Sequence, residues 1–151
     1  MLCVEGILFV RAVYETAECT PFAQSAQLPF ACEAPCPNWC CAARAEAKIL
    51  AAGITLSGGT AVHYECDETN GWNPDLADIE SKITENTQGL VIINPNNPTG
   101  AVYSEETVKG LVDIARRYDL VLFSDEIYEK IIFDDAVHHH TASYAGDDVL
   151  C

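Results

Sequence analysis

Basic residues are scarce in this sequence. Lys and Arg together number 8 among 151 residues, against 23 Asp and Glu, and the formal net charge is −15. The basic residues are scattered along the chain, and Arg116 and Arg117 are the one adjacent pair. Because binding to nucleic acid phosphates requires clustered Lys and Arg, we expect no nucleic acid partner.

Long apolar runs are missing as well. No stretch approaches the roughly 20 apolar residues that cross a bilayer. The opening, residues 1–13, faintly resembles a signal peptide, but Glu5 and Arg11 interrupt it and no basic region precedes it. Hydrophobic residues make up 49% and charged residues 21% of the chain, as in folded globular proteins. We therefore expect a cytoplasmic protein with reduced cysteines and no membrane partner.

Paired C-x2-C zinc motifs are absent, although the chain has 8 cysteines. Six of them fall within residues 1–52, four of these at positions 32, 36, 40 and 41, and no histidine lies nearer than His63. Three interpretations stay open for this cluster: sequence without regular structure, a zinc site, or disulfides. We treat residues 1–52 as an unassigned cysteine-rich stretch that need not be homologous to residues 53–151.

Regular patterns begin near residue 53. The alanine content predicts a short helix over residues 42–52, and residues 54–67 suggest two short β-like runs around a glycine turn. Residues 73–83 predict a helix, with Asn73 or Asp75 as its cap, Pro74 in its first turn and Leu76, Ile79 and Ile83 on one face. The apolar run over residues 90–93 is typical of a strand covered on both faces.

The clearest helix follows Ser104, a good N-cap. Glu105 and Glu106 suit its start, and Arg116 and Arg117 suit its end. Its expected apolar face consists of Val108, Leu111, Val112, Ala115 and Tyr118. A second buried strand, "LVLFSDEIY", comes next, followed by a short β-like run over residues 131–133 and a long loop.

The resulting order, strand, helix, strand, helix, strand, predicts an α/β fold with parallel strands. In such sheets, ligands bind outside the carboxyl ends of the strands. Two polar clusters, "NPNNPTG" at residues 94–100 and "SDEIY" at residues 124–128, follow the two strands of one βαβ unit. The sequence therefore predicts a ligand site where these two clusters meet.

The same two clusters carry a family resemblance. "NPNNPTG" followed by a helix, a strand and "SDEIY" resembles the class I/II, fold-type I aminotransferases that depend on pyridoxal 5'-phosphate (PLP). The longer run over residues 63–107 is similar to bacterial alanine aminotransferase-like members. The resemblance covers roughly residues 53–151. It implies part of the large PLP-transferase domain, a partial three-layer α/β sandwich with a mostly parallel sheet.

The resemblance also implies roles for three residues. Asp125 would lie beside the cofactor's pyridine nitrogen and favour its protonated form. Asn97 would donate a hydrogen bond to the phenolic oxygen, and Tyr128 would approach the same oxygen, which tunes the cofactor as an electron sink. Each residue also has a simpler interpretation: Asp125 as a cap, Tyr128 as packing, and Asn97 before Pro98 as turn chemistry.

Several further expectations follow from the resemblance. Family members often have a cis peptide before the proline that matches Pro98. The full enzyme would be a homodimer that moves an amino group between an amino acid, alanine by similarity, and a 2-oxo acid, 2-oxoglutarate. The imine-forming lysine would lie beyond Cys151, so we assign no catalytic residue here and expect the 151-residue chain alone to be inactive.

Two other features are interpreted without chemistry. We interpret the run His138, His139 and His140 as a solvated loop and assign no metal site, because adjacent imidazoles rarely converge on one ion without a separate scaffold. Lys130 follows Tyr128 too closely to be the imine-forming lysine. The alternative to an aminotransferase segment is a non-catalytic remnant whose cysteine-rich N-terminal stretch binds a metal or a partner.

Overall fold

The computed structural model describes residues 4–10 and 45–151. Its strands are β1 (Val4–Val10), β2 (Thr60–Asp67), β3 (Asn73–Pro74), β4 (Thr87–Ile93) and β5 (Val121–Asp125). Its helices are α2 (Ala45–Leu56), α3 (Leu76–Lys82), α4 (Glu105–Tyr118) and α5 (Ala142–Ala145), with a 3-10 turn at Glu68–Asn70. Among the described residues, no helix has the length and apolar character needed to cross a membrane. The cysteine cluster at positions 32–41 lies outside the described residues.

The strands form one sheet in the order β3-β2-β1-β4-β5. β4 and β5 are parallel, as expected, and β1 is antiparallel to both β2 and β4. Strands β2, β4 and β5 therefore run in the same direction, in agreement with the predicted α/β order. The expectation of a mostly parallel sheet is corrected, because β1 and the two-residue β3 pair with their neighbours in the antiparallel sense.

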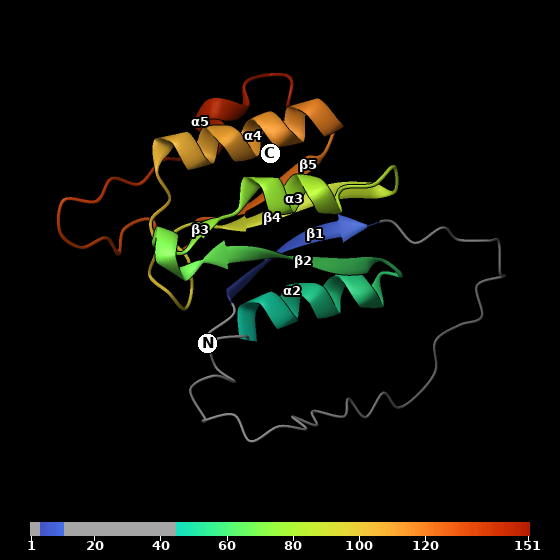
Figure 1. Ribbon diagram of the computed structural model, residues 1–151, viewed down its shortest axis with the longest axis horizontal. Helices are drawn as coiled ribbons and strands as arrows, with labels where there is room; N and C mark the ends of the chain where they lie inside the picture. Colours follow the sequence, from blue (N-terminus) through green and yellow to red (C-terminus); the bar gives the residue numbers. More distant parts are fainter. Residues whose placement is uncertain (1–3, 11–44) are drawn as a thin grey trace, which may run out of the picture.

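Helices cover both faces of this sheet (Figure 1). α3, α4 and α5 lie on one face, and α2 lies on the other, beside β1 and β2. The arrangement is the expected partial three-layer sandwich. β1, which belongs to residues 1–52, lies in the middle of the sheet and pairs with β2 and β4 from residues 53–151.

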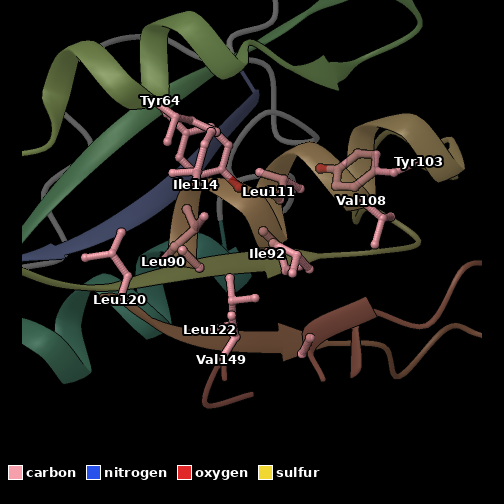
Figure 2. Packing of buried hydrophobic residues seen from close by; sticks show 14 of the residues in the cluster. Tyr64, Leu90, Ile92, Tyr103, Val108, Leu111, Ile114, Leu120, Leu122 and Val149 are labelled. Atoms are coloured by element: carbon pink, nitrogen blue, oxygen red, sulfur yellow. The ribbon is translucent and has the colours of Figure 1, made fainter. Parts of the chain in front are cut away.

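The main core lies between the sheet and α4 (Figure 2). Leu90 and Ile92 project from β4, Leu122 projects from β5, and Leu111 and Ile114 of α4 pack against them with almost no exposed area. Leu90 and Ile92 point to the same face of the sheet because side chains two residues apart in a strand lie on one side. The predicted apolar face of α4 is confirmed at Val108, Leu111, Val112 and Ala115, but Tyr118 at its last position is 43% exposed.

The helix caps agree with the sequence prediction at two sites. Ser104 caps α4 by accepting a hydrogen bond from Thr107 N, and Asp75 caps α3 by accepting from Ala77 N and Asp78 N. Pro74 precedes the cap and belongs to β3, so its predicted place in the first helical turn is wrong. The extended pairing of Pro74 with Cys66 holds it outside the helix.

Two predicted β-like runs are not strands. Residues 54–56 form the last turn of α2, which continues beyond the predicted end of its alanine-rich part. Residues 131–133 form an irregular segment after β5. A short apolar run does not by itself distinguish a strand from a helix or from irregular chain.

Candidate functional site

The two polar clusters meet at one edge of the sheet. In the parallel register, Ile93 at the end of β4 lies opposite Asp125 at the end of β5. The pairing extends one residue further, because Asn94 N donates a hydrogen bond to Asp125 O over 2.9 Å. The predicted juxtaposition of "NPNNPTG" and "SDEIY" is therefore present.

Two of the three asparagines build the turn itself. The fully buried Asn94 accepts a hydrogen bond from Tyr103 N at Oδ1 over 2.9 Å. Asn96 accepts from the Thr99 hydroxyl at Oδ1 over 2.9 Å, and Asn96 O accepts from Gly100 N over 2.8 Å. Gly100 has a φ of 73°, a conformation that glycine adopts without a steric cost. These contacts lead the chain from β4 toward the N-terminus of α4.

Asn97 is the asparagine that leaves the turn. Its Nδ2 donates a hydrogen bond to the Tyr128 hydroxyl over 3.1 Å. The peptide bond to Pro98 is cis, as the resemblance implies, and so is the bond between Asn94 and Pro95. The sequence alone did not single out that second cis bond.

A hollow of about 260 Å³ opens beside the Asn97–Tyr128 pair. Its lining consists of Pro95, Asn96, Asn97, Pro98, Gly100, Tyr128, Ile131 and Phe133. The amide and the phenol place two hydrogen-bond donors beside an apolar wall. Small-molecule sites have this character, with few polar groups on largely apolar walls. Sequence reasoning missed Ile131 and Phe133, because their apolar run suggested a strand.

Asp125 takes part in its own turn. Its Oδ1 accepts a hydrogen bond from Ile127 N over 3.2 Å, which is the capping role that an Asp after a strand often has. The side chain is partly exposed at the end of β5. The strand ends bring Asp125 to the same edge of the sheet as Asn97 and Tyr128.

Glu126, one residue further, was not predicted from the sequence. Burial opposes ionisation of its carboxyl group, but hydrogen bonds from Thr141 N, His140, His138 and Ser124 outweigh it and lower the pKa of Glu126 to about 2. The carboxylate therefore ties the turn after β5 to residues 138–141. The one feature of the sequence that could have indicated this contact is the spacing of His138 and His140, two residues apart.

A larger hollow of about 660 Å³ lies elsewhere, near the first residues of α3 and α4. Asp67, Asp75 and Glu106 contribute carboxylates to its lining. An acidic wall repels a phosphorylated ligand, so the smaller hollow beside Asn97 is the better candidate for one.

The family assignment follows from comparison with known proteins. The sequence model of the family described as aminotransferase class I and II matches residues 49–150. The chain belongs to this family. The matched residues include both polar clusters and the helix between them, so the geometry described above is that of an aminotransferase segment.

The relatives of this aminotransferase segment include enzymes with alanine in their names. It is 62% identical over 100 residues to the alanine aminotransferase of Mycobacterium tuberculosis, covering 66% of this chain and 23% of that protein. It is 59% identical over 96 residues to the glutamate-pyruvate aminotransferase AlaA of Escherichia coli, covering 64% of this chain and 24% of that protein. The chain thus spans about a quarter of the length of these relatives.

Solved structures agree. A crystal structure of an aminotransferase from Escherichia coli matches with a TM-score of 0.63 and 59% identity, covering 64% of this chain and 24% of that one. The alanine aminotransferase from Pyrococcus furiosus matches with a TM-score of 0.52 and 38% identity, covering 57% and 21%. The aminotransferase fold is therefore shared at the level of three-dimensional structure as well as sequence.

Proposed function

We propose that residues 53–151 are part of the large domain of a PLP-dependent aminotransferase and supply part of its cofactor site. The observation that carries this proposal is the hydrogen bond between Asn97 and Tyr128, which joins the ends of two adjacent parallel strands. In α/β sheets this is the edge at which ligands bind. The family membership and the relatives' names support the same function.

The donor set fits the cofactor. Asn97 Nδ2 and the Tyr128 hydroxyl are both hydrogen-bond donors at one point, and they would hold the phenolic oxygen. Asp125 is a carboxylate at the adjacent strand end and would hold the protonated pyridine nitrogen, because opposite charges stabilise each other in a partly desolvated site. When bound, PLP supplies an electron sink for reactions at the amino acid's α-carbon.

The remaining residues would position these three. The buried Asn94 and the Asn96–Thr99 pair fix the turn that presents Asn97. Ile131 and Phe133 line one side of the hollow and are 57% and 75% exposed. They would form an apolar wall for a bound cofactor.

We further propose the substrates and the assembly of the complete enzyme. The names of the relatives above support a transfer of the amino group between alanine and 2-oxoglutarate. The family resemblance implies that the complete enzyme is a cytoplasmic homodimer. The alternative, a cysteine-rich binding module, depends on residues 32–41, which lie outside the described part of the chain, and no observation favours it.

We also propose that the 151-residue chain does not transaminate by itself. The side chains of Lys82, Lys109 and Lys130 are each paired with a carboxylate: Lys82 with Asp78, Lys109 with Glu105, and Lys130 with Glu129. None of them lines the hollow beside Asn97. A transaminase needs a lysine amine at its reacting centre.

A chimera tests the proposed function. The segment of the E. coli glutamate-pyruvate aminotransferase AlaA that aligns with this chain is replaced by the matching residues of this chain, and transamination of pyruvate by glutamate is measured. We expect activity, because the segment is 59% identical. Asp125→Ala should lower kcat/KM by at least about tenfold, since a lost charged hydrogen bond costs roughly 1.5–3 kcal/mol.

The matched control in the chimera is Asp113→Asn, a change on the exposed side of α4 that leaves the hollow intact. It should keep the activity of the parent chimera. If the folded Asp125→Ala chimera is as active as the Asp113→Asn chimera, the assigned role of Asp125 is contradicted.

A further inference from the structure

The three consecutive histidines do not face the same way. His138 Nε2 lies 3.1 Å from Glu126 Oε2, and His140 Nδ1 lies 2.6 Å from the same oxygen. His139 Nδ1 instead lies 3.1 Å from the Tyr144 hydroxyl. Alternate residues of an extended chain project to opposite sides, so the first and third imidazoles meet and the middle one is turned away. The His138 and His140 rings lie edge to face with their centroids 4.6 Å apart.

A second carboxylate completes the cluster. Glu129 Oε2 lies 3.5 Å from His140 Nδ1. One nitrogen or oxygen atom from each of Glu126, Glu129, His138 and His140 lies within 4.8 Å of all the others. Around a tetrahedral zinc ion, with bonds of about 2.0–2.1 Å, neighbouring ligand atoms are roughly 3.3 Å apart. The three separations given above lie on both sides of that value, so small side-chain movements would form a site.

The turn after β5 is the scaffold that adjacent histidines alone lack. Glu126 Oε1 accepts hydrogen bonds from Thr141 N over 2.9 Å and from the Ser124 hydroxyl over 2.8 Å. These bonds fix the carboxylate and direct Oε2 toward the two imidazoles. Outer hydrogen bonds of this kind orient metal ligands in proteins.

We propose that Glu126, Glu129, His138 and His140 bind a divalent transition metal ion such as Zn²⁺. Two imidazole nitrogens with carboxylate oxygens suit such an ion, whereas Mg²⁺ and Ca²⁺ prefer oxygen ligands throughout. The ion would bind His138 Nε2 and His140 Nδ1 in the neutral tautomers whose proton lies on the other ring nitrogen, in place of their hydrogen bonds to Glu126. It would also join the turn after β5 to residues 138–140.

The side chain of His138 is 5% exposed and that of His140 is 50% exposed. The expectation of a solvated loop over residues 138–140 is therefore wrong for His138. The metal site is independent of the proposed cofactor function, since it uses neither Asn97, Asp125 nor Tyr128. Its four proposed ligands include no cysteine.

The test is a titration of the purified 151-residue chain with Zn²⁺ by calorimetry, after iodoacetamide has blocked the accessible thiols. We expect saturable binding to the alkylated chain. His140→Asn and Glu129→Gln should each weaken it by at least tenfold, because each removes one ligand. His139→Asn is the matched control and should bind as the parent does, because His139 faces Tyr144.

Cobalt gives a second readout. Co²⁺ bound to nitrogen and oxygen ligands shows visible absorption without the sulfur charge-transfer band of a thiolate site. Binding that disappears on alkylation, or that is equally weakened by His139→Asn and His140→Asn, overturns the proposal. Circular dichroism shows which variants fold. If His140→Asn does not fold, the metal affinity of Glu129→Gln, on the partly exposed turn, decides between the outcomes.

Discussion

Asn97 Nδ2 donates a hydrogen bond to the Tyr128 hydroxyl over 3.1 Å, although 31 positions separate the two residues in the sequence. The parallel pairing of β4 with β5 produces this contact, because it brings the carboxyl ends of both strands to one edge. α4 provides the crossover between them. The contact therefore depends on the whole βαβ unit.

The Asn97–Tyr128 contact should appear as a coupling in a double-mutant cycle. Asn97→Ala and Tyr128→Phe should each lower the free energy of unfolding by about 0.5–1.5 kcal/mol, the usual net value of a hydrogen bond. The double variant should lose less than the sum of the two, since either change removes the shared bond. Urea denaturation measures all four proteins. Tyr118→Phe, at a half-exposed helix end, is the control. Strictly additive losses of unfolding free energy for Asn97→Ala and Tyr128→Phe would contradict the contact.

The core under α4 should be far more sensitive than the surface of α2. Leu111 is fully buried against the sheet, so Leu111→Ala should cost about 2–5 kcal/mol through lost burial and a residual cavity. Leu56 is 77% exposed, and Leu56→Ala should change the free energy of unfolding by less than about 0.5 kcal/mol. Equal losses in the two variants would show that the described core is not the one that stabilises the chain.

The sequence was sufficient for the elements with strong local signals. α4 was predictable because Ser104, the acidic first turn and the apolar period agree, and β4 was predictable from its continuous apolar run. Both strand-end clusters followed from the expected parallel pairing. The family resemblance implied that Asn97 and Tyr128 approach the same cofactor oxygen, but it did not predict the direct hydrogen bond between them.

Other features depend on tertiary contacts that no local pattern encodes. β1 lies between β2 and β4 and is antiparallel to both. Nothing in the sequence of residues 4–10 predicts which strands they pair with. Residues 54–56 extend a helix although their composition suits a strand. The role of Glu126 depends on His138 and His140, which reach it across a long loop.

Asp78 should make the stability depend on pH in the acid range. Burial, the largest single effect, raises the pKa of Asp78, but hydrogen bonds from Lys82 and Glu65 N together with the Lys82 charge lower it below 3.8. A lowered folded-state pKa contributes stability above the unfolded value, and this is lost as the pH falls through the folded value. Asp78→Asn should therefore be less stable than the parent at pH 7 by about 0.5–1.5 kcal/mol.

The difference between Asp78→Asn and the parent should shrink as unfolding is measured at lower pH, from pH 7 toward pH 3. Glu85→Gln is the control, because Glu85 is exposed on the turn before β4. A difference that stays constant over the whole range would show that ionised Asp78 contributes nothing beyond its shape.

The isolated chain should not capture PLP at one lysine. Lys82, Lys109 and Lys130 are paired with carboxylates, and none lines the hollow beside Asn97. Borohydride reduction after incubation with PLP should give at most scattered, substoichiometric labelling, as peptide mass spectrometry would show. Stoichiometric labelling of one lysine would contradict the proposal that the 151-residue chain is inactive by itself.

The most direct test of the cofactor site is the retention of PLP by the chimeric enzyme and its variants. After dialysis, absorbance and fluorescence give the amount bound. We predict stoichiometric PLP in the parent chimera and in Asp113→Asn. Asn97→Ala should have a several-fold higher Kd, and Asp125→Ala a Kd higher by at least about tenfold, the equivalent of roughly 1.4 kcal/mol. Folded Asn97→Ala and Asp125→Ala chimeras that retain PLP as tightly as the parent would contradict the assignment of the cofactor to these strand ends.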